Sequence, residues 1–127
     1  MKRLVDTNIF LEIFLSQARR GDCEQYLNQH IGYLYLSDFT LHSIGVILFK
    51  RGKYADYQQF TIDILPKVQL LSLPQNQYFD LPLYASTYGL DFDDTYQFAI
   101  AKEYDLTIAT MDTDFRKVAQ MIPIEFI

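Results

Sequence analysis

The sequence predicts an α/β fold built on a mainly parallel sheet. Short apolar runs, typical of buried strands, alternate along the chain with longer segments of helical periodicity. Half of the residues are hydrophobic, which is enough for one well-filled core, and 127 residues is a length typical of one domain. The chain contains no internal repeat, low-complexity tract or linker-like stretch. We therefore expect a single domain over residues 1–127.

The first half of the chain is expected to supply two strands and four helices. Leu4-Val5 predicts a short first strand, and residues 33–36 predict the second. Either Ser37 or Asp38 is expected to cap the helix that follows the second strand, and Pro66 to end the last of the four helices. The four helices are expected at residues 8–17, 22–29, 38–50 and 54–65.

The second half repeats the alternation with three more strands and three more helices. Gly89 is expected to end a helix that has Pro82 near its start. The strands are expected at residues 68–73, 107–110 and 124–127, and the helices at 76–88, 94–104 and 114–120. Strands that alternate with helices in this way favour crossover connections between parallel strands.

Acidic residues stand where such a fold would bring them together. Asp6 directly follows the first predicted strand, and Asp112 follows the apolar run 106–111. Ligands bind parallel sheets beyond the carboxyl ends of the strands, so we expect both in one crevice, with Asp94 joining from the start of its helix. Clustered carboxylates repel one another unless a cation is bound, and oxygen ligands favour Mg²⁺ or Mn²⁺. Metal-dependent phosphodiester chemistry is the hypothesis that follows.

Helix capping is the alternative interpretation of each acidic residue. Asp6 precedes a predicted helix, where its carboxylate would accept a backbone N–H. One of Asp93 and Asp94 would suffice as a cap, which leaves the other carboxylate free. Asp114 could cap the short helix after residue 113, and Asp112 would then be free at the strand edge.

The overall composition limits the other classes of function. The formal net charge of −5 counts against strong non-specific binding of nucleic acid but does not exclude a nuclease, whose acidic site would hold metal. The one cysteine, Cys23, excludes an intrachain disulfide and suits a reducing compartment, so we expect a cytoplasmic protein. No apolar run approaches the roughly 20 residues of a membrane span, so no membrane association is expected. The ten Phe and ten Tyr lie mostly at helical or strand spacing, which favours core positions over base stacking.

Four stretches of the chain, taken in order, form a recognisable set. They are Leu-Val-Asp-Thr-Asn-Ile-Phe-Leu at 4–11, Leu-Ser-Asp-Phe-Thr-Leu-His-Ser-Ile at 36–44, Leu-Asp-Phe-Asp-Asp-Thr-Tyr-Gln-Phe-Ala-Ile-Ala at 90–101 and Leu-Thr-Ile-Ala-Thr-Met-Asp-Thr-Asp-Phe at 106–115. Together they resemble the PIN domain, and most closely the VapC-like toxins of type II toxin–antitoxin modules. The resemblance implies a three-layer α/β/α fold with a central, mainly parallel sheet of four to five strands. It also implies Mg²⁺- or Mn²⁺-dependent endoribonuclease activity. Asp6, Asp94 and Asp112 match the acidic positions of the family and are the expected catalytic and metal-binding residues, with Asp114 as an additional metal ligand.

The chain departs from the family pattern at Ser43, which occupies the place of a glutamate that the family usually has. Asp93 and Asp38 are the residues that could compensate for the missing charge. The resemblance implies a small antitoxin protein as partner, RNA as substrate and a homodimer. The apolar stretch 41–49 is a possible interface. The alternative is a catalytically weakened PIN domain that binds RNA or protein. A phosphoryl-transfer receiver is disfavoured, because Asp112 and Asp114 lie at the wrong end of the chain and no suitably placed lysine follows a late strand.

Overall fold

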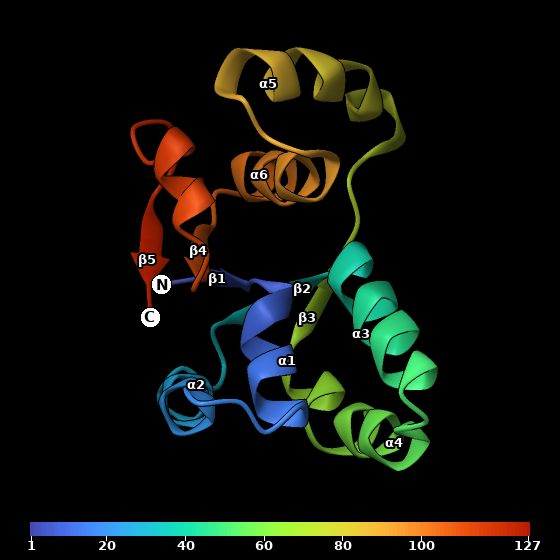
Figure 1. The fold of residues 1–127 in the computed structure, drawn as a ribbon. Coiled ribbons are helices and arrows are strands. Elements are labelled where there is room, and N and C mark those ends of the chain that lie inside the picture. The colour runs from blue at the N-terminus through green and yellow to red at the C-terminus, as the bar shows by residue number, and fades with distance from the viewer.

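The computed structural model describes all of residues 1–127, and five parallel strands form its centre (Figure 1). The strands are β1 (Arg3–Val5), β2 (Leu34–Ser37), β3 (Gln69–Leu71), β4 (Thr107–Thr110) and β5 (Ile124–Phe126). They lie in the order β3-β2-β1-β4-β5, so β1 is central and pairs with β2 on one side and β4 on the other. The predicted parallel sheet is confirmed.

Helices cover both faces of this sheet. In Figure 1, helices α5 and α6 lie above the sheet and α1 to α4 lie below it. The α-helices are α1 (Thr7–Phe14), α2 (Arg20–Gln29), α3 (Asp38–Lys50), α4 (Tyr54–Asp63), α5 (Leu81–Tyr88) and α6 (Phe92–Tyr104). Three short 3-10 helices complete the chain: η1 (Leu65–Lys67), η2 (Gln75–Asp80) and η3 (Thr113–Val118). The three-layer α/β/α architecture is as expected.

Alternation along the strands divides the core into two clusters, one on each face of the sheet. Leu4 and Ile108 belong to the cluster packed with α5 and α6, whereas Val5 and Ala109 belong to the cluster packed with α1 to α4. Because successive side chains of a strand point to opposite faces, β1 and β4 contribute to both clusters. Both strands are therefore buried on both sides, and their carboxyl ends are fixed in position.

Several element boundaries differ from the sequence prediction. Helix α6 begins at Phe92 rather than at residue 94, because Asp91 is its N-cap. The predicted helix 76–88 is divided into η2 and α5, with Pro82 in the first turn of α5, where a missing backbone N–H costs no hydrogen bond. The segment predicted as a helix at 114–120 is the 3-10 helix η3. Strand β3 is three residues long instead of six.

The two ends of the chain lie close together, and side chains join them. The carboxylate of Glu125 on β5 accepts hydrogen bonds from Arg3 Nε at 3.1 Å and from the Tyr26 hydroxyl at 2.5 Å. Burial alone would raise the pKa of Glu125, but these two donors outweigh it, so its pKa lies below the usual value. None of the helices is both long and apolar enough to cross a membrane.

Candidate functional site

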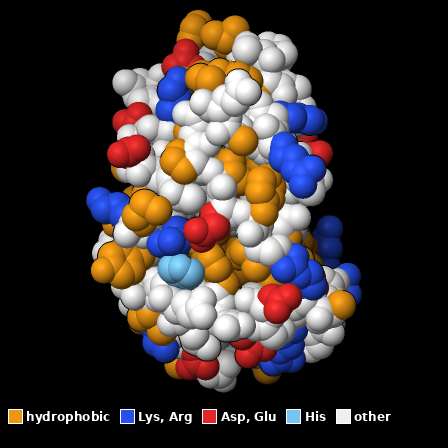
Figure 2. Space-filling view, turned by 90° about the vertical axis from the view of Figure 1, so that its left-hand side faces the viewer, with side chains coloured by type: hydrophobic (Ala, Val, Ile, Leu, Met, Phe, Trp, Pro, Cys, Tyr) orange, Lys and Arg blue, Asp and Glu red, His pale blue; other side chains and the backbone are white.

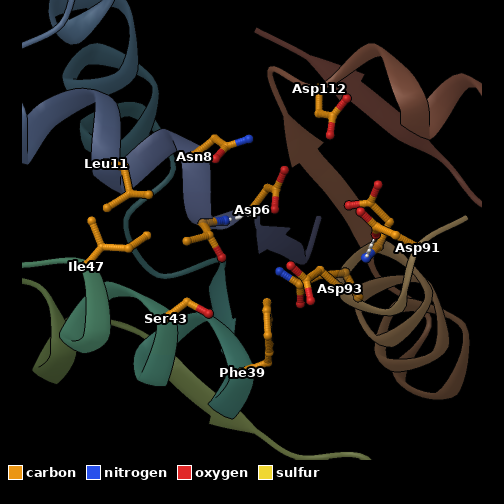
Figure 3. Close-up of a pocket in the computed structure, with 12 residues that line it drawn as sticks. Asp6, Asn8, Leu11, Phe39, Ser43, Ile47, Asp91, Asp93 and Asp112 are labelled. Carbon is orange, nitrogen blue, oxygen red and sulfur yellow. Dashed lines mark hydrogen bonds between the residues drawn. The ribbon is translucent and has the colours of Figure 1, made fainter. Parts of the chain in front are cut away.

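An acidic pocket of about 230 Å³ lies at the carboxyl edge of the central strands. Its acidic residues come from the ends of β1 and β4 and from the start of α6, and the opposite wall is formed by α3 (Figure 3). They are Asp6, Asp91, Asp93, Asp94 and Asp112. No lysine, arginine or histidine lines the pocket, so its negative charge has no cationic partner there. The sequence prediction that Asp6, Asp94 and Asp112 share one crevice agrees with this geometry.

Asp6 is held rigidly at the bottom of the pocket and is only 6% exposed. It is the N-cap of α1, where one carboxylate oxygen accepts the backbone N–H of Thr7 at 2.8 Å. The other oxygen accepts the hydroxyl of Thr110 at 2.7 Å. Burial raises the pKa of Asp6 above its usual value although these donors oppose the shift. Capping and pocket lining are therefore not exclusive, because the same carboxylate does both.

The start of α6 supplies three carboxylates, and the structure corrects the expected cap. Asp91 accepts the backbone N–H of Asp94 at 2.9 Å, so neither Asp93 nor Asp94 is the cap. The sequence analysis did not identify Asp91, although its spacing of three residues from Asp94 resembles a capping box. Asp93 and Asp94 are left in the first turn with their side chains facing the pocket.

Asp94 carries the clearest electrostatic signature of the site. Burial first, and then repulsion from Asp91, Asp112, Asp6 and Asp114, raise its pKa to about 7. A carboxyl group with such a pKa is half protonated near neutral pH in the absence of a cation. The pocket therefore already holds about as much negative charge as it can without an added positive charge.

The segment after β4 also reverses the expected roles of two aspartates. Asp112, not Asp114, is the N-cap of η3, since its carboxylate accepts the backbone N–H of Asp114 at 2.9 Å. The backbone N–H of Asp112 in turn donates to the hydroxyl of Thr110, which donates to Asp6. This chain of hydrogen bonds fixes Asp112 relative to Asp6.

Three of the carboxylates come close enough to share one cation. Asp94, Asp112 and Asp114 each offer an oxygen, and these oxygens lie within 4.8 Å of one another. Asp6 lines the same pocket as Asp94 and Asp112 but is not part of this tighter group. The structure thus brings together the four expected residues as a group of three with a buried fourth beside them.

The α3 wall of the pocket is neutral, and Ser43 is part of it. Of the two residues that could compensate for its missing charge, Asp93 lines the pocket, whereas Asp38 does not. The Asp38 carboxylate instead accepts the hydroxyl of Tyr96 and the backbone N–H of Phe39. Asp93 is therefore the acidic residue available opposite Ser43, and burial raises its pKa.

Buried polar side chains that the sequence analysis missed lie beneath this wall. The hydroxyl of Thr40 contacts those of Thr7 at 2.9 Å and Ser37 at 3.2 Å, and it accepts Gln97 Nε2 at 2.8 Å. Gln97 also lines the pocket, and its Oε1 is buried without a hydrogen-bond partner. No sequence pattern marks this cluster, because its members come from three helices and the end of β2.

Comparison with known proteins identifies the fold. The family model described as PIN domain matches residues 3–121. Solved structures of similar fold include a toxin–antitoxin complex from Klebsiella pneumoniae, with a TM-score of 0.76, 20% identity, and coverage of 97% of this chain and 95% of that one. FitAcB from Neisseria gonorrhoeae has a TM-score of 0.77, 24% identity and coverage of 97% and 96%. The sarcin-ricin loop cleaving toxin VapC20 from Mycobacterium tuberculosis has a TM-score of 0.78, 16% identity and coverage of 91% and 93%. No curated protein sequence matches the chain.

Proposed function

The chain belongs to the PIN domain family, and on that premise we propose that it is a Mg²⁺- or Mn²⁺-dependent endoribonuclease, the toxin of a type II toxin–antitoxin module. The observation that carries the proposal is the acidic pocket with its group of three carboxylates. The likeness of its fold to a chain of the toxin–antitoxin complex from Klebsiella pneumoniae supports a role in such a module.

The residues present fit a divalent cation bound by oxygen. Carboxylate oxygens are the ligands that Mg²⁺ and Mn²⁺ prefer. Asp94, Asp112 and Asp114 each offer one such oxygen, and these oxygens lie within 4.8 Å of one another, so the three side chains would hold a cation between them. A cation there would also relieve the repulsion that raises the pKa of Asp94. We assign Asp6, Asp94, Asp112 and Asp114 as the metal-binding residues, and Asp6, Asp94 and Asp112 as the catalytic ones.

Different residues of the pocket would have different roles in phosphodiester hydrolysis. A bound divalent cation supplies positive charge that polarises the phosphoryl group and lowers the pKa of an attacking water. Asp94 and Asp112 would hold that charge against the scissile phosphate. The hydrogen bonds from Thr110 and Thr7 hold the carboxylate of Asp6 in one orientation. The polar cluster around Thr40 would keep the α3 wall at a fixed distance from α6.

A small antitoxin protein is the proposed partner, and a homodimer the proposed assembly. Residues 41–49 lie within α3, and the helix is only partly covered by the rest of the chain. Ile44 and Leu48 are buried in the core, whereas Val46 and Phe49 are exposed beside a hollow that Tyr57 also lines. We place the dimer contact on this exposed side of α3.

A weakened PIN domain that binds RNA without cutting it is the second candidate, and Ser43 is the observation that favours it. A hydroxyl at this position supplies no charge for the cation. Asp93 on the facing helix favours retained activity, because its carboxylate lines the pocket in place of the glutamate that Ser43 replaces.

The test is RNA cleavage measured while Mg²⁺ or Mn²⁺ is titrated, with Asp112→Asn as the inactive variant. We expect cleavage that depends on the cation and is lost in the variant. Asp63→Asn, a change of the same charge on exposed α4, is the matched control and should cleave as the wild type does. RNA binding without cleavage at saturating Mn²⁺ would establish the weakened domain instead.

A further inference from the structure

A second hollow, of about 380 Å³, lies next to the acidic pocket. It is lined by Asp38, Phe39, His42, Tyr78, Phe92 and Tyr96, which come from α3, η2 and α6. Phe39 lines both hollows, and Figure 3 shows it at the α3 side of the acidic pocket. Phe92 directly precedes Asp93 and Asp94, so the aromatic wall and the acidic wall are successive residues of one helical turn.

The aromatic rings of this hollow are held in place around Tyr96, which is 3% exposed. The ring centroids of Phe39, Tyr78 and Phe92 lie 6.1, 5.9 and 6.3 Å from that of Tyr96. The hydroxyl of Tyr96 accepts the backbone N–H of Leu73 at 3.1 Å and donates to Asp38 at 2.7 Å. Burial, together with hydrogen bonds to neighbouring groups, raises its pKa, so it stays a donor. These contacts hold the rings around Tyr96 in one arrangement.

The outer rings of the hollow face solvent. Phe92 is 59% exposed and Tyr78 is 44% exposed. Single exposed aromatic residues are common on protein surfaces. Here, however, they converge with a carboxylate and an imidazole on one concavity, which is the pattern of a small-molecule or base pocket. Only Oδ1 of Asp38 accepts hydrogen bonds from the protein, so Oδ2 is available to an N–H of a ligand.

The charge of the molecule indicates which ligand suits this hollow. The net charge is −5, and the acidic pocket repels phosphates. On the face shown in Figure 2, Lys and Arg side chains are interspersed with acidic and apolar ones, and several gather along the right-hand side. Because the net charge of the whole chain is negative, we expect phosphate contacts to supply little affinity for RNA. Stacking of a base on aromatic rings does not depend on charge and tightens binding by about 5- to 150-fold per base.

We propose that an unpaired nucleobase of the RNA substrate stacks on Phe92 and Phe39 in this hollow and so positions the neighbouring phosphodiester at the acidic pocket. The inference rests on the proposed nuclease function for the identity of the substrate. Base binding itself needs no cleavage and can be measured separately. It would explain how an acidic protein retains a single-stranded substrate, and it predicts a preference for unpaired over base-paired RNA.

The absence of tryptophan from the chain provides a direct test. Phe92→Trp introduces a single fluorescent reporter in the hollow. Tyr33→Trp is the matched control, because Tyr33 is similarly exposed (52%) and directly precedes β2, at the opposite edge of the sheet from the acidic pocket. Both variants are titrated in EDTA with a short single-stranded RNA and with an abasic oligonucleotide of the same length. We expect RNA, but not the abasic chain, to quench the fluorescence of the Phe92→Trp variant and to leave the control unchanged. Equal responses to both chains, or in both variants, overturn the proposal.

Cleavage kinetics provide a second, independent measurement of the same proposal. Loss of one stacked base corresponds to about a 5- to 150-fold lower kcat/KM for Phe92→Ala, and Tyr33→Ala should leave kcat/KM unchanged. If the wild type cleaves RNA and both alanine variants match it, base stacking is wrong and the nuclease function stands. If no cation supports cleavage but RNA still quenches the Phe92→Trp variant selectively, the nuclease function is wrong and the base site stands. Thermal melts of each variant show that the fold is intact.

Discussion

Replacing Asp94 by asparagine should stabilise the cation-free protein while removing its ability to be stabilised by a cation. The pKa of Asp94 is raised from 3.8 to about 7, a difference of about 3 units. At about 1.36 kcal/mol per unit, this corresponds to about 4 kcal/mol of destabilisation by the ionised group. Asp94 is half-buried, so solvent screening reduces this figure. The favourable interaction of a carboxylate with the start of a helix also opposes it by about 0.3–1 kcal/mol. We expect a net gain of about 1–2 kcal/mol for Asp94→Asn at pH 8.

The gain should depend on pH in a defined direction. An unfolded aspartate loses its proton near pH 3.8, whereas the folded Asp94 keeps it until about pH 7. Between these values the folded state binds more protons, so the free energy of unfolding of the wild type falls as pH rises. The asparagine variant lacks this term. Its advantage should be smallest below pH 4, grow steadily between pH 4 and 7, and be complete above pH 7.

Urea denaturation in EDTA between pH 5 and 8.5 measures the effect, with the midpoint followed by circular dichroism. Addition of Mg²⁺ should then reverse the order, because a ligand that binds only the folded wild type stabilises it by RT ln(1 + [L]/Kd). A variant that is less stable than the wild type at pH 8 in EDTA would refute the electrostatic reasoning. So would a difference that is the same at every pH.

Three further substitutions test other parts of the structure. Ser43→Glu should tighten Mn²⁺ binding by about tenfold in calorimetry, since it adds a carboxylate to the pocket; unchanged affinity would mean that position 43 does not face the cation. Thr110→Val should lower the free energy of unfolding by about 1–3 kcal/mol, because it leaves buried Asp6 without its hydroxyl donor; a neutral result would show that water replaces the hydroxyl. Glu125→Gln should cost about 1 kcal/mol or less at pH 7, because the partner of Arg3 is partly exposed. The pKa of Glu125 is lowered in the folded state, so this stabilisation is present above pH 4.5 and is lost as pH falls below it; a cost that persists at pH 3 would contradict the assignment.

The fold was predictable because its main features follow from local patterns. Alternation of short apolar runs with helical segments indicated parallel strands, and the carboxyl ends of parallel strands share one edge. That geometry was enough to place Asp6 and Asp112 in one pocket without knowledge of any contact. Single-domain organisation, homodimer formation and the metal roles of the aspartates stay predictions.

The capping roles could not be assigned from sequence. Near α6 the chain offers three aspartates within four residues, and each could accept a backbone N–H. Which one does so depends on the residue at which helical φ and ψ begin, and that is set by the packing of Tyr96 and Phe98 against the sheet. For the same reason the sequence suggested Asp114 as the cap of the helix after β4, whereas the structure has Asp112 in that role. Local propensity identifies a group of capping residues, whereas tertiary packing selects the member.

The electrostatics of the pocket explain why residue 43 can be neutral. Five carboxylates already line it, and their mutual repulsion leaves Asp94 half protonated near pH 7. A sixth carboxylate on α3 would strengthen cation binding and at the same time destabilise the cation-free protein, since each added like charge disfavours the ionised forms of the others. Asp93, on the facing helix, already supplies the charge that a glutamate at 43 would add. A serine at position 43 is therefore compatible with cation binding, because Asp93 on the opposite side of the pocket carries the negative charge instead. This account requires that Asp93→Asn weaken Mn²⁺ binding more in the wild type than in a chain that also carries Ser43→Glu, a coupling that a double-mutant cycle measures directly.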